Sequence, residues 1–258
     1  MSDSVNVLLL HGWAANHHIF DLLATGLPEC RIAAPDLPGH GAAECNGTFD
    51  VAAVADSLVT QLSEPVHLLG WSLGGMVALH MAAHHPEKVR SLCLTASFAR
   101  LTAAPDYPEG LAKPALGKMI PLFAQDFAKY MRQFLQLQFL HIPDRAHLAD
   151  EVLPEIIRHG VPPGLQAALD AVVHTDARVL LPQVQCPVLL VFDGKDGITP
   201  PRMGEYLHRQ LPNSRLLMIE KAAHIPFLSH ADEFSAAYRV FIGLPEKHNR
   251  LKNIKKPF

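Results

Sequence analysis

Short apolar runs alternate along this chain with longer segments of helical periodicity. The apolar runs are nearly continuous, and they lie at residues 5–10, 31–34, 66–69, 89–95, 188–192 and 215–219. Such runs are typical of strands that are buried on both faces of a parallel sheet. Helical spacing lies between them, at residues 51–62, 73–84, 201–211 and 231–241. The alternation predicts βαβ units and an α/β fold with a mostly parallel, doubly wound sheet.

Residues 98–181 interrupt this alternation. They show no strand pattern, only helical patterns rich in Leu, Ala and Phe that are broken by eight prolines. Because α/β sheets bind ligands in the crevice at the carboxyl ends of their strands, such an insertion predicts a helical lid there. The alternative is a separate helical domain, which the return to strand pattern afterwards disfavours. We therefore expect a core at residues 1–97 and 182–246, a lid at 98–181, and a solvated basic tail at 247–258.

Composition and charge narrow the classes of function. The 258 residues are 49% hydrophobic, enough for one large core, and the net charge of −3 lacks the basic excess of nucleic-acid binders. The apolar run at residues 7–10 is too short for a signal peptide or a membrane span. The four cysteines form no Cys-x-x-Cys pair, and the sixteen histidines show no His-Glu-x-x-His spacing. We expect a cytoplasmic monomer that binds no nucleic acid, membrane, metal or other cofactor.

The strongest chemical signal is the hexapeptide Gly70-Trp71-Ser72-Leu73-Gly74-Gly75. It follows an apolar strand and precedes a helical run, which is the setting of a Gly-x-Ser-x-Gly nucleophile elbow. Its glycines allow close packing around a strained turn, and the helix N-terminus favours negative charge that develops there. We predict that Ser72 is a catalytic nucleophile. The alternative is a plain glycine turn in which Ser72 only caps the helix.

A serine nucleophile needs a general base, and elbow-type hydrolases carry serine, acid and histidine in that order along the chain. His224 lies just after the last predicted strand, at the same edge of the sheet as the elbow. Its rival His230 lies at the start of the next helix. We therefore favour His224 as the base.

Two aspartates compete for the role of the acid. Asp193 lies at the end of the strand at residues 188–192, where local hydrogen bonds would fix its side chain. Asp196 lies on a loop between two glycines, from which it can reach a histidine. We favour Asp196 as the residue that holds the His224 tautomer and stabilises its imidazolium.

An oxyanion hole needs backbone N–H groups aimed at the developing charge. One is expected from Leu73, and the other from the loop after an early strand. His11-Gly12-Trp13 fits that loop, because Gly12 permits the turn and the N–H of Trp13 would point into the site. The indole of Trp13 is expected either to line the pocket or to be a core aromatic. We expect His11 and the turn at residues 36–41 to be structural.

Together these motifs resemble the α/β-hydrolase family over nearly the whole chain. In detail they resemble the biotin-pathway esterases that remove the methyl group from pimeloyl-[acyl-carrier protein] methyl ester. That closer resemblance rests on Trp13, on the tryptophan inside the elbow, and on residues 221–230 and 134–138. The chain begins almost at the oxyanion strand, so we expect the N-terminal β-hairpin of the family to be absent.

The resemblance implies a Ser-His-Asp carboxylesterase that yields methanol and the carrier-bound acid. It implies substrate contacts from Trp13, Ser72, Leu73, Phe134, Leu135, Gln136, Leu137, Gln138 and His224. Without the resemblance, residues 134–138 are an ordinary amphipathic helix face. The implied partner is an acyl carrier protein, which is acidic. Candidate contacts to it are the basic lid residues Lys129, Arg132, Arg145 and Arg158, with ordinary solvated surface as the alternative.

Two other functions stay open. A short-chain carboxylesterase, a thioesterase or a C–C hydrolase would use the same triad, so the triad cannot separate them. A non-enzymatic receptor or scaffold can also have this fold, but the presence of serine, aspartate and histidine disfavours it.

Overall fold

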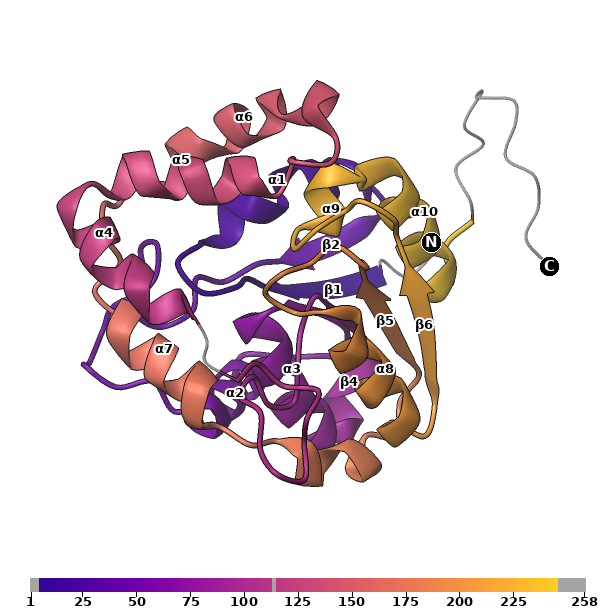
Figure 1. Cartoon of the computed structure of the whole chain (residues 1–258). Coiled ribbons are helices and arrows are strands. Elements are labelled where there is room, and N and C mark those ends of the chain that lie inside the picture. Colours follow the sequence, from indigo (N-terminus) through magenta and orange to yellow (C-terminus); the bar gives the residue numbers. More distant parts are fainter. Residues whose placement is uncertain (1–4, 113–114, 246–258) are drawn as a thin grey trace.

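Six parallel strands form one sheet in the computed structural model, which describes residues 5–112 and 115–245 (Figure 1). The order across the sheet is β2-β1-β3-β4-β5-β6. The strands are β1 (Val5–Leu10), β2 (Cys30–Ala33), β3 (Val66–Trp71), β4 (Val89–Thr95), β5 (Val188–Phe192) and β6 (Ser214–Met218). The predicted α/β fold is confirmed, and within the described ranges neighbouring strands pair in parallel throughout.

The strand boundaries differ little from those predicted. β1, β4 and β5 have the predicted bounds, and β2 and β6 each begin and end one residue earlier than predicted. β3 runs two residues further than predicted, because Gly70 and Trp71 still pair with β4. This extension carries the sheet directly into Ser72.

Helices cover both faces of the sheet (Figure 1). One face carries α1 (Asp21–Thr25) and α10 (Ala231–Phe241), and the other carries α2 (Val51–Thr60), α3 (Leu73–His84) and α8 (Pro201–Gln210). The apolar runs of the strands are buried between these layers, as a two-sided sheet requires. In α3, nine of the twelve residues are buried. The helix that follows Ser72 is therefore a core helix with a fixed position.

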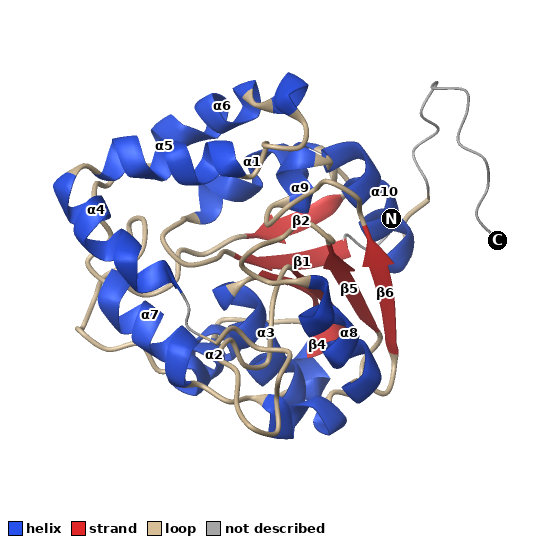
Figure 2. Cartoon of the chain, viewed as in Figure 1, coloured by secondary structure: helices blue, strands red, loops and turns tan. Residues whose placement is uncertain are grey.

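The inserted residues contain helices and no strand, within 98–112 and 115–181. They form the α-helices α4 (Met119–Gln125), α5 (Phe127–Leu137), α6 (His147–Ile156) and α7 (Leu165–His174). They also form the 3-10 helices η3 (Ala115–Lys118), η4 (Pro143–Arg145) and η5 (Arg178–Gln183), the last of which ends two residues beyond the insertion. Figure 2 shows these four helices together on one side of the molecule. We call residues 98–181 the helical insertion.

Hydrogen bonds fix the helical insertion over the carboxyl ends of the strands. The indole Nε1 of Trp13 donates to the carbonyl of Leu165 at 2.8 Å, and the N–H of Gly164 donates to the carbonyl of Gly39 at 2.9 Å. Trp13 follows β1 and Gly39 follows β2. The helices thus lie where α/β sheets bind their ligands.

The predicted basic tail at residues 247–258 lies outside the described residues. Among the helices that the structure describes, none is both long and apolar enough to cross a membrane.

Candidate active site

Ser72 lies in a strained turn between β3 and α3. Its φ of 53° and ψ of −118° fall outside the regions that residues with a side chain favour. A Cβ on Gly70 would lie 2.5 Å from the carbonyl oxygen of Gly74, and a Cβ on Gly74 would lie 2.1 Å from that of Leu10. Only glycines let the strand, the helix and the end of β1 approach so closely. The geometry is that of a nucleophile elbow.

Neighbouring strand ends hold Ser72 in this turn. Its N–H donates to the carbonyl of Thr95 at 3.2 Å, and its carbonyl accepts the hydroxyl of Ser97 at 2.8 Å. Both partners belong to the end of β4 and the residues after it. A strained backbone persists where its surroundings fix it in this way.

Asp196 and His224 form a buried pair. Oδ2 of Asp196 lies 2.8 Å from Nδ1 of His224, and the two side chains are 1% and 3% exposed. Burial by itself would raise the pKa of Asp196, but the charge of His224 and hydrogen bonds from His224 and Thr199 outweigh it and lower that pKa. Asp196 therefore stays ionised. Because it binds Nδ1, the other nitrogen of His224, Nε2, is the one that can accept a proton.

Asp193, the other candidate for the catalytic acid, accepts hydrogen bonds from backbone N–H groups instead. Its carboxylate accepts the N–H groups of Lys221 at 3.0 Å and Ala223 at 2.7 Å. Both residues have positive φ, of 66° and 50°. The expected hydrogen bonds of Asp193 are therefore not local to its strand end. They reach the histidine loop, residues 219–225, because β5 and β6 are neighbours and their loops meet.

The histidine loop lies beside the elbow. The indole Nε1 of Trp71 donates to the carbonyl of His224 at 2.7 Å, and the two ring centroids are 5.5 Å apart. Because Trp71 immediately precedes Ser72, this contact ties the histidine to the nucleophile. The described residues show no hydrogen bond between the Ser72 hydroxyl and His224. Catalytic hydrogen bonds are often long or misaligned without substrate and shorten in the complex.

The two predicted oxyanion donors belong to different segments: Leu73 to the elbow and Trp13 to the loop after β1. Leu73 is the first residue of α3, so its N–H has no carbonyl partner within the helix. Trp13 follows β1, whose end is in close contact with Gly74. Ala14 has a φ of 65°, which shows a tight turn after Trp13. Trp13 and Leu73 therefore both lie at the sheet edge that carries Ser72.

His11 holds the loop at residues 11–14, which carries the predicted oxyanion donor Trp13, through two hydrogen bonds to backbone groups. Its Nε2 accepts the N–H of Leu37 at 2.9 Å, and its Nδ1 lies 2.8 Å from the carbonyl of Gly12, to which it donates. Burial and the neighbouring His40 lower the pKa of His11 to about 3. The ring therefore stays neutral and keeps the acceptor that Leu37 needs.

Two other residues considered from the sequence also have structural contacts. Nδ1 of His230 lies 3.1 Å from the hydroxyl of Ser229, outside the Asp196 pair. In the turn at residues 36–41, Asp36 accepts the N–H of His17 at 2.8 Å and that of Ala42 at 2.9 Å. These bonds hold the turn together.

A pocket of about 320 Å³ opens between α5 and the Asp196 loop. It is lined by Leu111, Met119, Phe134, Leu137, Gln138, Lys195, Asp196, Gly197, Ile198 and Ala223. Three of the five insertion residues expected to contact substrate thus line it, because 134, 137 and 138 share one face of the helix. Leu135 is buried beneath α5 and Gln136 is exposed to solvent, and neither lines this pocket.

Three side chains support the site in a way that the sequence does not predict, and one of them, Gln138, was expected to contact substrate instead. The hydroxyl of Thr199 donates to Asp196, and that of Ser97 donates to Ser72. The amide of Gln138 accepts the N–H of His224 at 3.0 Å. The Ser97 and Gln138 contacts join the site to segments whose position is set by the fold, whereas Thr199 lies only three residues from Asp196.

The four basic residues proposed to contact a carrier differ in their surroundings. Arg132 and Arg158 form exposed ion pairs with acidic residues of the helical insertion. The ammonium of Lys129 lies 5.2 Å from the ring centroid of its neighbour Tyr130. Arg145, in contrast, donates to the carbonyl of Ser229 at 2.7 Å, so it also supports the segment after the histidine loop.

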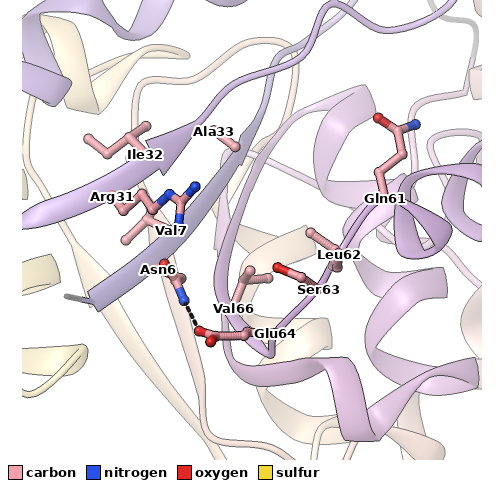
Figure 3. Close-up of a pocket in the computed structure, with 10 residues that line it drawn as sticks. All are labelled: Asn6, Val7, Arg31, Ile32, Ala33, Gln61, Leu62, Ser63, Glu64 and Val66. Atoms are coloured by element: carbon pink, nitrogen blue, oxygen red, sulfur yellow. Dashed lines mark hydrogen bonds between the residues drawn. The ribbon is translucent and has the colours of Figure 1, made fainter. Parts of the chain in front are cut away.

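A second pocket, of about 220 Å³, lies at the amino ends of β1 and β3 (Figure 3). Asn6 donates to Glu64 there at 2.8 Å. The length of the strands separates this pocket from Ser72, which lies at their carboxyl ends, so it is no part of the site. Among residues 5–112 and 115–245, no three His, Cys, Asp or Glu side chains are placed to hold a metal ion.

Comparison with known proteins agrees with this fold. The family model for the alpha/beta hydrolase fold matches residues 5–231. A protein from Neisseria meningitidis serogroup C, named pimeloyl-[acyl-carrier protein] methyl ester esterase, is 60% identical over 94% of this chain and 95% of its own. A protein of the same name from Chromobacterium violaceum is 36% identical over 90% and 92%. The solved esterase from Exiguobacterium antarcticum has a TM-score of 0.82 at 26% identity, over 94% and 93%.

Proposed function

This chain belongs to the α/β-hydrolase family, and we propose that it hydrolyses pimeloyl-[acyl-carrier protein] methyl ester to methanol and pimeloyl-[acyl-carrier protein] in biotin biosynthesis. The substrate is that named for relatives at 60% and 36% identity. The observation that carries the chemistry is the buried Asp196–His224 pair beside the strained serine.

The first half of the reaction forms an acyl-enzyme. Oγ of Ser72 attacks the ester carbonyl carbon while Nε2 of His224 takes the serine proton. Asp196 stabilises the imidazolium, and the N–H groups of Leu73 and Trp13 stabilise the oxyanion. The intermediate then collapses: the bond to the methoxy group breaks, and His224 gives its proton to the leaving methoxide. Methanol departs, and the acyl group stays on Ser72.

The second half releases the acid. Water attacks the acyl-enzyme carbonyl while His224 again takes a proton, and the same donors bind the oxyanion. Collapse breaks the bond to Ser72, whose oxygen recovers a proton from His224. The products are the free carboxylic acid, still attached to its carrier, and the original enzyme.

The helical insertion is proposed to be the lid of this site. Its pocket residues Phe134 and Leu137 offer apolar walls beside Asp196, which suit a methylene chain. The exposed Lys129, Arg132 and Arg158 would attract an acidic carrier to the same face, mainly by raising the association rate. We further propose that the protein is a monomer and that it is cytoplasmic. The four unpaired cysteines support the second proposal, since they are typical of reducing compartments.

The test is methanol release from the carrier-bound methyl ester by the purified protein. Ser72→Ala should lower the rate by about 10⁴-fold or more while the protein stays folded, because a lost nucleophile has no substitute. The matched control is Ser57→Ala, at an exposed serine of α2, which should keep full activity. Undiminished turnover in Ser72→Ala would end the serine-hydrolase mechanism.

The same assay separates the alternatives. Turnover of p-nitrophenyl acetate without methanol release would favour a general esterase, and preferential cleavage of the carrier thioester would favour a thioesterase. Restored growth without biotin, in a strain that lacks its methyl esterase, would support the biological role.

A further inference from the structure

Gln138, which follows α5, joins the helical insertion to the histidine loop. Its Oε1 accepts the backbone N–H of His224 at 3.0 Å, and its Nε2 donates to the carbonyl of Phe134 at 3.1 Å. The residue is only 6% exposed, so water does not readily replace these bonds. One amide thus connects segments 86 residues apart in the chain.

We propose that Gln138 is a positioning residue, which fixes His224 for catalysis when α5 is docked on the core. The proposal rests on the Ser72–His224–Asp196 chemistry proposed above. It makes the helical insertion part of the device that places the general base, in addition to a wall for the substrate.

The histidine loop needs such support because its backbone is strained. Lys221 and Ala223 have positive φ, and the carboxylate of Asp193 holds both of their N–H groups from the core side. The next N–H, that of His224, is held from the other side by Gln138. Strained backbone relaxes when the groups that fix it are removed. Without Gln138, a buried N–H would lose its partner next to the catalytic imidazole.

A second contact couples the same two parts. Arg145 of the helical insertion donates to the carbonyl of Ser229 at 2.7 Å. The hydroxyl of Ser229 in turn donates to the carbonyl of Ala222 at 2.8 Å. The insertion therefore reaches the histidine loop both directly, at His224, and through Ser229.

This role differs from the substrate contact implied by the resemblance. Both ends of the Gln138 amide already bond backbone groups of the protein. Phe134 and Leu137, which line the pocket from the same helix face, are the residues available to an acyl chain. We therefore assign the positioning of His224 to Gln138, and contact with the acyl chain to Phe134 and Leu137.

The test uses a small substrate, p-nitrophenyl acetate, which does not fill an acyl-chain pocket. Gln138→Met keeps the length of the side chain but removes the amide. It should lower kcat by about 10- to 100-fold with KM changed by less than about twofold, since a displacement of about 1 Å at a catalytic group can cost about 100-fold. Gln138→Glu keeps an oxygen acceptor and should retain more of kcat than Gln138→Met.

The matched control is Gln133→Met, the same change at an exposed position of α5, which should leave kcat unchanged. Unchanged kcat in Gln138→Met, with a raised KM for the carrier-bound ester, would mean a substrate contact and overturn the proposal. A lower melting temperature with unchanged kcat per titrated Ser72 would mean a merely structural role, and would overturn it as well.

Hydrogen exchange gives a readout that does not depend on turnover. The backbone amide of His224 should exchange about tenfold faster in Gln138→Met than in the wild type, because its acceptor is gone. Equal exchange rates would overturn the proposal. If the wild type hydrolyses the small ester but not the carrier-bound one, the proposed substrate fails while the assignment of Gln138 is still tested.

Discussion

The elbow and the histidine loop both contain strained backbone, but different kinds of contact hold it in place. Both contain strained backbone, at Ser72 in one and at Lys221 and Ala223 in the other. The elbow is fixed by direct backbone packing, because glycines bring β1, β3 and α3 into contact. The histidine loop is fixed by side chains that bond its backbone, among them Asp193 and Trp71 from the core and Gln138 from the helical insertion.

The difference shows where the catalytic machinery can respond to its surroundings. The nucleophile is set by the core and does not depend on the helical insertion. The general base depends on both the core and the helical insertion, because the histidine loop has a hydrogen-bond partner in each. Changes at the elbow glycines should therefore affect folding and activity together, whereas changes around His224 can alter activity in a protein that stays folded.

The largest effect should come from Asp196, and the comparison with Asp193 tests which aspartate is the acid. Asp196→Asn should lower kcat on p-nitrophenyl acetate by about 10⁴-fold, because an amide favours the wrong histidine tautomer. Asp193→Asn should lower it far less, by about 10- to 100-fold, because it loosens the loop without touching the imidazole. Steady-state kinetics and thermal unfolding separate the two roles. The opposite ranking would show that Asp193 is the acid.

Gly74→Ala should break the elbow through its backbone. The added Cβ would lie 2.1 Å from the carbonyl oxygen of Leu10, so β1 and α3 must separate. We expect a loss of about 3 kcal/mol in the free energy of unfolding, the upper range for overpacking, together with most of the activity. The matched control is Gly117→Ala, whose Cβ would meet only Leu169, at 3.8 Å. Equal stability of the two variants in urea denaturation would refute close packing at Gly74.

Charge reversal on the helical insertion should have a smaller and selective effect. Arg132→Glu with Arg158→Glu should raise KM for the carrier-bound ester about five- to tenfold, with little change for p-nitrophenyl acetate, since charge complementarity acts on association. The effect should shrink at 0.5 M salt, which screens exposed charges. Arg145 is unsuitable for this test, because its reversal would also disturb Ser229. Equal loss on both substrates would indicate a damaged insertion.

The smallest effect on stability at neutral pH should come from replacing His11, in the loop that carries Trp13. Its pKa falls from an ordinary value of 6.5 to about 3, so between these values the unfolded chain binds the extra proton. Stability should therefore fall as the pH drops below about 6.5, by up to about 1.4 kcal/mol per pH unit from this one group. Urea denaturation at pH 7, 6 and 5 should show a weaker dependence in His11→Asn. The exposed His147→Asn should keep the slope of the wild type.

The sequence by itself determined the fold and the order of its chemistry. Short continuous apolar runs are typical of strands that are buried on both faces of a sheet, and here they predict the strand bounds to within one or two residues. The elbow was equally readable, because Gly70, Ser72 and Gly74 are neighbours in the chain and a local turn decides their geometry. The positions of His224 and Asp196 followed from the rule that parallel strands present their carboxyl ends at one edge.

Only the tertiary structure decided how these residues are held. It separated Asp196, at 2.8 Å from the imidazole, from Asp193, which holds the backbone of the next loop. It also brought Gln138 to the N–H of His224 across 86 residues. No local pattern encodes such contacts. They depend on how layers pack, and a one-turn shift of α5 would leave the sequence pattern intact while removing the hydrogen bond to the catalytic loop.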